Sequence, residues 1–176
     1  MATNSTSVVE SARGGDRFAF QSLVERYQVP IHRYIYRLTG DIDLARELTI
    51  KTFVTAHRKL QHAGRDLRFD AWLYRLATDV TRSALRWRRL QALLPRRRVE
   101  LLASPDDDAE ARAMQRWLRS LRIDVAACLL LWSMGGFSYD EIGRILRLSG
   151  RGVGRRMTQA RQQLRRIRLS EAGGRA

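Results

Sequence analysis

The sequence predicts an all-α protein of two small helical domains joined by a linker. Apolar residues recur every three or four positions over most of the chain, which is the spacing of helices that bury one face. A stretch rich in proline and charge, residues 90–110, separates two such regions and is typical of a linker. The chain has 176 residues, of which 44% are hydrophobic, enough for two compact cores.

The first domain is expected over residues 15–89, after a disordered tail at residues 1–14. Helical spacing of apolar residues then begins and continues past Pro30, which is expected to interrupt or kink the helix. Gly40 supplies a helix stop, and Asp41 can cap the helix that follows.

Residues 42–60 form a predicted helix with two distinct faces. The face assigned to the core contains Ala45, Leu48, Thr49, Thr52, Phe53 and Ala56. The opposite face carries Glu47, Ile50, Lys51, Val54 and Arg58. On it, Ile50 and Val54 lie one turn apart and face water among mixed charges, which indicates a protein-docking surface. A chance pair of exposed apolar residues is the alternative.

After a polar loop at Gln61–Phe69, a helix is predicted from Trp72 to about Arg89. Its apolar side, expected to face the core, contains Leu73, Leu76, Ala77, Val80, Ala84 and Trp87. Its other side carries a row formed by Arg75, Arg82, Arg86 and Arg89, with Thr78 and Asp79 beside it. Because no acidic residue stands one turn away to balance this row, we interpret it as a surface for a polyanion. An ordinary solvated face is the alternative.

The second domain is expected over residues 111–168, before a disordered tail at 169–176. A helix that starts at Ala109 and a largely buried helix at Asp124–Met134 lead to the stretch Ser138–Arg166, which is typical of a helix-turn-helix.

The turn between these last two helices has clear local signals. Ser138-Tyr139-Asp140-Glu141 is a capping box that starts the first helix. Gly143 lies within its apolar stripe, where a small residue lets another helix pack closely. Arg147-Leu148-Ser149 makes the turn, and Ser149 caps the second helix.

The second helix has an apolar side that docks it and a polar side that suits a DNA groove. The apolar side contains Val153, Met157, Ala160 and Leu164. The polar side contains Arg151, Arg155, Thr158, Gln159, Gln162 and Arg166, and Ser149 and Arg156 join the candidate DNA contacts. Gly150, Gly152 and Gly154 each cost about 1 kcal/mol relative to alanine in a helix. Either the helix starts late, or a close approach such as a phosphate offsets that cost. A solvated basic face is again the alternative.

Charge and composition favour a nucleic-acid partner. The net charge is +15, and all but two of the 33 basic residues are arginine, whose fork suits phosphates and guanine edges. Nucleic acid is therefore expected rather than a membrane. There is no secretory signal, the longest apolar run is too short to span a bilayer, and the single cysteine, Cys128, fits a buried hydrophobe. We expect a cytoplasmic protein.

Nothing in the sequence predicts catalysis. His32, His57 and His62 are scattered without metal-ligand spacing, and neither a phosphate loop nor a nucleophile elbow occurs. The run Asp106-Asp107-Asp108 lies in the linker and is interpreted as solvated charge. We expect no enzyme activity, no cofactor and no metal.

Two basic helical faces on separate domains suggest two contacts with DNA. At this point the residues resemble the extracytoplasmic-function (ECF) group of bacterial RNA polymerase sigma factors. In the first domain the resemblance rests on Gly15-Asp16, Leu38-Thr39-Gly40-Asp41 and Trp72-Leu73-Tyr74-Arg75-Leu76-Ala77. In the second it rests on Gly136-Phe137-Ser138-Tyr139-Asp140-Glu141-Ile142, Ala160-Arg161 and Leu164-Arg165.

The resemblance implies a transcription initiation factor that directs core RNA polymerase to promoters. Polymerase docking would involve Glu47, Ile50, Lys51 and Val54. The −10 element would be opened and held by Gln61, His62, Arg75, Thr78, Asp79, Arg82, Arg86 and Arg89, with the loop Gln61–Phe69 holding a flipped base. The −35 element would be read by Ser149, Arg151, Arg155, Arg156, Thr158, Gln159 and Gln162. The implied partners are core polymerase, double-stranded promoter DNA and single-stranded −10 DNA, with an anti-sigma factor as a further candidate.

Three positions depart from the family pattern on the docking helix and leave other functions open. Glu47, Ile50 and Lys51 stand where the family usually has an aspartate, a glutamine and an acid. A stand-alone DNA-binding regulator on a sigma scaffold is therefore an alternative, and a non-specific nucleic-acid binder is a third.

Overall fold

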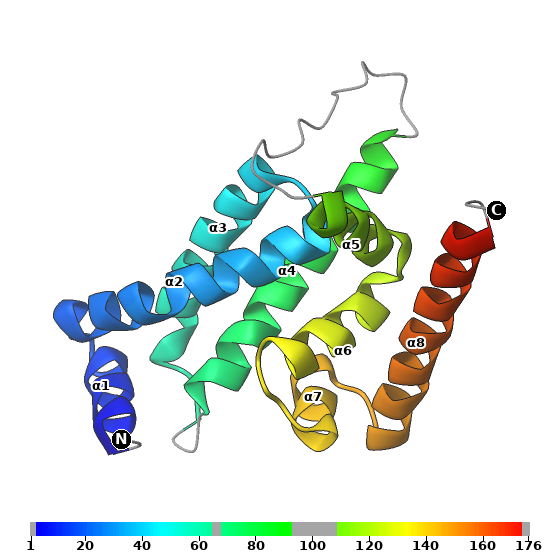
Figure 1. The fold of residues 1–176 in the computed structure, drawn as a ribbon. Helices are drawn as coiled ribbons and strands as arrows, with labels where there is room; N and C mark the ends of the chain where they lie inside the picture. The colour runs from blue at the N-terminus through cyan, green and yellow to red at the C-terminus, as the bar shows by residue number, and fades with distance from the viewer. Residues whose placement is uncertain (1–2, 65–67, 93–108, 174–176) are drawn as a thin grey trace. The chain divides into compact units, whose positions relative to one another are not determined.

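The computed structural model describes residues 3–64, 68–92 and 109–173, and the regular structure within these residues is entirely helical (Figure 1). The chain divides into two compact units, Met1–Leu102 and Ala103–Ala176. Unit 1 contains α1 (Thr3–Arg13), α2 (Arg17–Thr39), α3 (Ile42–Leu60) and α4 (Phe69–Ala92). Unit 2 contains α5 (Ala109–Ser120), α6 (Ile123–Ser133), α7 (Tyr139–Leu146) and α8 (Gly150–Gly173). The predicted all-α fold in two parts is confirmed. None of the helices described is both long enough and apolar enough to cross a bilayer.

The predicted disordered tail at residues 1–14 is wrong, because helix α1 spans Thr3–Arg13. It packs against α2, and its Val9 and Ala12 side chains are buried. The chain then turns tightly, because the Asp16 backbone N–H donates to the carbonyl of Ser11. The apolar stripe of α1 is only a few residues long, which is why its spacing alone did not indicate an ordered helix.

Helix α2 runs through Pro30, so the predicted interruption does not occur. It starts at a cap in which the Asp16 carboxylate accepts hydrogen bonds from two backbone N–H groups, and it stops at Gly40, whose φ of 66° is left-handed. The turn after the proline contributes Ile31, Tyr34 and Ile35, all fully buried. Burial of these side chains offsets the hydrogen bond that the proline cannot donate.

The core of unit 1 lies between α2, α3 and α4, which pack against one another. The face of α3 that was assigned to the core is buried at all six positions. A polar contact crosses this core, where the Tyr34 hydroxyl lies 2.8 Å from the Thr78 hydroxyl. The Tyr34 ring also meets the Tyr74 ring edge-on, with centroids 5.1 Å apart.

Asp41 joins the start of α3 to the end of α4. One carboxylate oxygen accepts from the Leu44 backbone N–H at 2.9 Å, and the other accepts from the Arg88 guanidinium at 2.7 Å. Burial on its own would raise the pKa of Asp41, but these hydrogen bonds outweigh it and hold the pKa below 3.8. The carboxylate therefore acts as a helix cap and a tertiary tether together.

The last turns of α4 extend beyond the core. Trp87 was assigned to the core face but is 61% exposed, because α4 continues to Ala92 past the packed region that buries Leu73 and Ala77. The predicted linker at 90–110 overlaps both helix ends, since α4 includes residues 90–92 and α5 starts at Ala109. Residues 93–108 lie outside the described part of the chain.

Unit 2 is built around α6, which packs against α7 and α8. Cys128 is fully buried in this helix, and burial raises the pKa of its thiol to about 11, as expected of an inert, buried side chain. The predicted disordered tail at 169–176 is corrected in part, because α8 stays helical to Gly173. Residues 174–176 lie outside the described residues.

Replacing Asp41 by alanine is expected to lower the free energy of unfolding of unit 1 by about 2 kcal/mol, because it removes a helix cap and a charge-assisted hydrogen bond. Urea unfolding followed by circular dichroism measures the loss. Asp43→Ala is the matched control: the Asp43 carboxylate is exposed and its 3.4 Å contact with Arg46 is also exposed, so little change is expected. Because the folded-state pKa of Asp41 is lowered, its contribution is present above 3.8 and disappears as the pH falls through that lowered value. Equal losses in both variants at neutral pH would contradict the tether.

Candidate nucleic-acid interface

The turn of the helix-turn-helix has the local geometry that the sequence predicts. The Ser138 side chain accepts from the Glu141 backbone N–H at 3.3 Å, and the Glu141 carboxylate accepts from the Ser138 backbone N–H at 2.8 Å. Helix α7 ends at Arg147, whose φ of 57° is left-handed. A Cβ at Gly143 would lie 2.7 Å from the Leu148 carbonyl oxygen, so only glycine lets the turn fold back this closely.

Helix α8 begins at Gly150, so of the two alternatives left open by the sequence, the late start does not occur. The Ser149 hydroxyl accepts from the Gly152 backbone N–H at 3.1 Å, which confirms Ser149 as the cap. At Gly152, a Cβ would lie 3.2 Å from that same hydroxyl oxygen. Gly154 has open space around it, so close packing within the chain does not account for a glycine there.

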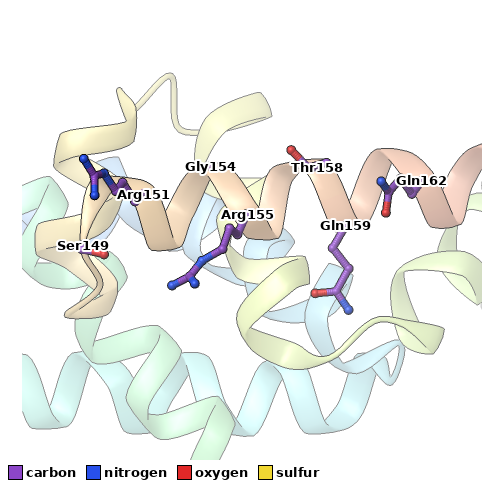
Figure 2. A pocket seen from close by; sticks show the side chains of 7 residues that line it. All are labelled: Ser149, Arg151, Gly154, Arg155, Thr158, Gln159 and Gln162. Atoms are coloured by element: carbon purple, nitrogen blue, oxygen red, sulfur yellow. The ribbon is translucent and has the colours of Figure 1, made fainter.

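One groove gathers six of the seven predicted −35 residues along α8. It has a volume of about 790 Å³ and is lined by Ser149, Arg151, Gly154, Arg155, Thr158, Gln159 and Gln162 (Figure 2). The Arg155 and Gln159 side chains project from the same side of the helix (Figure 2). On the opposite side, Val153, Met157 and Ala160 are buried, and this packing sets the rotation of α8. The groove presents guanidinium and amide donors, which are the groups that read base edges in a major groove.

Arg156 does not belong to this groove, which corrects its place among the candidate DNA contacts. Its guanidinium Nε donates to the Asp124 carboxylate at 2.9 Å, and both side chains are largely buried. Although burial alone would raise the pKa of Asp124, the hydrogen bond from Arg156 and the charges of Arg122 and Arg156 lower it. Arg156 therefore holds α8 against α6.

The arginine row of α4 is exposed in part: Arg86 and Arg89 are exposed, whereas Arg75 and Arg82 are half-buried. The expectation that no acidic residue balances the row is wrong, because the Arg82 guanidinium lies 3.4 Å from the exposed carboxylate of Asp79, one turn earlier. The prediction that Thr78 contacts DNA is wrong, because this residue is 1% exposed and cannot reach DNA. Its hydroxyl donates to the Tyr74 carbonyl at 2.8 Å in addition to its contact with Tyr34.

The loop after α3 begins with exposed residues. Gln61 and His62 are both exposed, and their backbone continues the last turn of α3 through a hydrogen bond from the His62 N–H to the Lys59 carbonyl. Phe69, placed at the end of the loop by its sequence, instead starts α4 and is buried. Residues 65–67 lie outside the described part of the chain.

The predicted docking face of α3 is exposed, and its Ile50 and Val54 line one wall of a groove, whereas Glu47 and Lys51 lie outside the lining. Glu47, Ile50, Lys51 and Val54 are all exposed, Ile50 at 61% and Val54 at 45%. The groove has a volume of about 410 Å³ and is lined by Phe20, Val24, Gln28, Thr49, Ile50, Phe53, Val54, His57 and Arg58. Its other wall comes from α2, where Phe20 and Val24 belong to the helical spacing of apolar residues expected before Pro30. The apolar stripe of α2 is wider than the part that packs in the core, and this excess width was the signal in the sequence for the second wall.

The described residues contain no cluster of histidine, cysteine and carboxylate side chains that could hold a metal ion. The polar side chains that line the two grooves carry hydroxyl, amide, imidazole and guanidinium groups. Together the fold and these surfaces define a helical DNA-binding protein of the helix-turn-helix class.

Comparison with known proteins shows similarity to RNA polymerase sigma factors. The sequence pattern of Sigma-70 region 2 matches residues 23–91, which include α3 and most of α4. The chain is 31% identical over 171 residues to the ECF RNA polymerase sigma factor SigE of Mycolicibacterium smegmatis, covering 86% of this chain and 63% of that protein. It is 28% identical over 174 residues to the RNA polymerase sigma-H factor of Pseudomonas aeruginosa, covering 89% and 90% of the two chains.

Solved structures agree with the fold. The structure of CnrH in complex with the cytosolic domain of CnrY matches with a TM-score of 0.72 at 24% identity, over 94% of this chain and 97% of that chain. The sigma factor RpoE in complex with the anti-sigma factor NepR from Bartonella quintana matches with a TM-score of 0.70 at 18% identity, over 84% and 95%. Residues 23–91 thus match Sigma-70 region 2, and most of the chain is similar in sequence to ECF-group RNA polymerase sigma factors.

Two neighbouring arginines on α8 are expected to behave differently. Arg155→Ala should lower affinity for duplex DNA by about tenfold or more if it reads a base edge, while the stability of unit 2 stays unchanged. Arg156→Ala should lower the free energy of unfolding of unit 2 by about 1–3 kcal/mol, because Asp124 loses its charged partner, while the folded fraction keeps its affinity. Fluorescence anisotropy at fixed salt and urea unfolding give the two readouts. The assignment is wrong if both variants lose affinity equally with unchanged unfolding midpoints.

Proposed function

We propose that this chain directs core RNA polymerase to promoters, with unit 2 reading the −35 element and unit 1 engaging the −10 element. The observation that carries this proposal is the α8 groove, where arginine and amide side chains line an open face of a helix-turn-helix. Such a helix fits the width of the major groove of B-DNA. The −35 and −10 roles are assigned to residues 111–168 and 15–89, as the sequence predicts.

The arginine row of α4 supports the proposed role of unit 1. Its exposed arginines could follow the phosphate backbone at the −10 element, while Gln61 and His62 stand at the start of the loop proposed to hold an unpaired base. Thr78 is left out of this surface because it is buried.

The groove between α2 and α3 is the proposed polymerase-docking surface. Ile50 and Val54 present apolar area beside Glu47 and Lys51, a mixture that fits a protein partner better than a phosphate backbone. In this proposal the polymerase carries the chemistry and the chain is not an enzyme. It would act in the cytoplasm, where an anti-sigma factor could compete for the same surface.

A stand-alone DNA-binding regulator remains a second candidate, because the net charge of +15 favours DNA binding without any partner. Ile50 and Lys51, which depart from the family pattern on the docking helix, also favour this second candidate.

Reconstitution with core polymerase separates these two functions. The proposal expects the chain to shift core polymerase on a native gel and to support run-off transcription from templates selected out of a randomised promoter library. Core polymerase alone is the control. Selected templates should share two motifs. Sequence-specific duplex binding without polymerase, together with no shift of core polymerase, would instead establish the stand-alone regulator.

Ile50→Asp is expected to weaken the complex with core polymerase by about tenfold or more, because a carboxylate would be buried in an apolar contact. Duplex DNA binding by the free chain should not change. Ile42→Asp is the matched control, since Ile42 is 40% exposed on the same helix but does not line the groove. Titration of labelled protein with core polymerase measures the affinity of both variants. An unchanged affinity for Ile50→Asp would remove this groove as the docking surface.

A further inference from the structure

Arg13 links α1 to the loop that follows α3, across 51 positions of sequence. Its guanidinium Nη2 donates to the Gly64 carbonyl oxygen at 2.7 Å. Its Nη1 lies 3.2 Å from a carboxylate oxygen of Glu10, one turn earlier on α1. The Arg13 side chain is only 12% exposed, whereas Glu10 is half exposed. Arg13 is thus held in one orientation between its own helix and the loop.

At this end of the loop, the backbone hydrogen bonds of His62 and Ala63 are short-range. The His62 and Ala63 N–H groups donate to carbonyls three residues back in α3, both at 3.1 Å. Gly64 has no side chain, and open space surrounds the position that its Cβ would take, so side-chain packing does not hold it. Within the described residues, the Arg13 guanidinium therefore provides the long-range hydrogen bond that orients the Gly64 peptide.

The far end of the loop is anchored in a different way. Phe69 is 5% exposed, and its ring centroid lies 5.4 Å from that of Tyr27 and 5.8 Å from that of Trp72. Arg68 also contacts the Asp70 carboxylate at 3.1 Å. One end of the loop is thus fixed by aromatic packing on α2 and α4, and the other by a guanidinium from α1.

We infer that Arg13 is a positioning residue for promoter opening: it sets the position of the Gly64 carbonyl and, through it, of the adjoining Gln61 and His62, the exposed residues proposed to contact the −10 element. This inference rests on the proposed function of the loop. Arg13 is too buried to follow DNA phosphates itself. A planar guanidinium with two fixed donors suits the role, because it constrains both distance and direction. Helix α1 holds Arg13 in place because its own Val9 and Ala12 side chains are buried.

The test measures base preference in the holoenzyme, using a promoter selected by run-off transcription. Open-complex formation is compared between the selected template and templates changed at single positions of the −10 or the −35 element. Arg13→Gln is expected to reduce the preference at one −10 position by up to about tenfold, because the effect of orienting the loop is at most that of the charge-assisted hydrogen bond to Gly64. Preferences at the −35 element should stay unchanged. Arg13→Lys keeps a charged donor and should restore part of the lost preference.

Arg17→Gln is the matched control for charge, because Arg17 is exposed and lies four positions further along the chain. It should keep the wild-type −10 preference. A general loss of stability would lower transcription from every template and leave the ratios between templates unchanged, so this outcome for Arg13→Gln overturns the inference. Should the glutamine variant not fold, an Arg13→Lys protein with fully wild-type −10 ratios and Gly64 amide hydrogen exchange also overturns it. If the wild-type holoenzyme shows no −10 preference, the proposed function of the loop fails instead.

Discussion

The burial of one apolar face on each helix is the constraint on which the functional surfaces depend. An arginine without a partner loses several kcal/mol when it leaves water, so the packing of a helix also decides which arginines stay outside. On α8, the buried side chains of Val153, Met157 and Ala160 set the rotation of the helix. That rotation turns Arg151 and Arg155 into the open groove. The proposed DNA-facing surface and the core are two sides of one packing arrangement.

Three arginines each meet an acceptor from a distant part of the chain, and two of them, Arg13 and Arg156, are largely buried. Arg88 reaches Asp41, Arg156 reaches Asp124, and Arg13 reaches the Gly64 carbonyl. The two aspartates keep lowered pKa values in spite of their burial, because the guanidinium hydrogen bonds favour the charged carboxylate. In a chain this rich in arginine, the partner of each guanidinium separates these structural arginines from those of the proposed DNA-facing surface.

The two candidate grooves differ in how they are built. The α8 groove follows one helix and the turn before it, where the tight approach at Gly143 brings Leu148 and Ser149 into place. The unit 1 groove needs two helices, since Phe20 and Val24 of α2 face the exposed side of α3. A surface on one helix can be read from its spacing, whereas a surface shared between helices depends on how they pack.

The sequence by itself determined the helices after α1, the capping box and the helix-turn-helix. It also determined the arginine rows and the resemblance to sigma factors. All of these follow from local chemistry and from spacing within single helices. Only the tertiary structure decided that Thr78 is buried, that Trp87 is exposed and that Arg156 pairs with Asp124. It also decided that α1 is ordered. Helical spacing shows which residues share a face, but burial depends on where the neighbouring helix ends and on which acceptor it brings within reach.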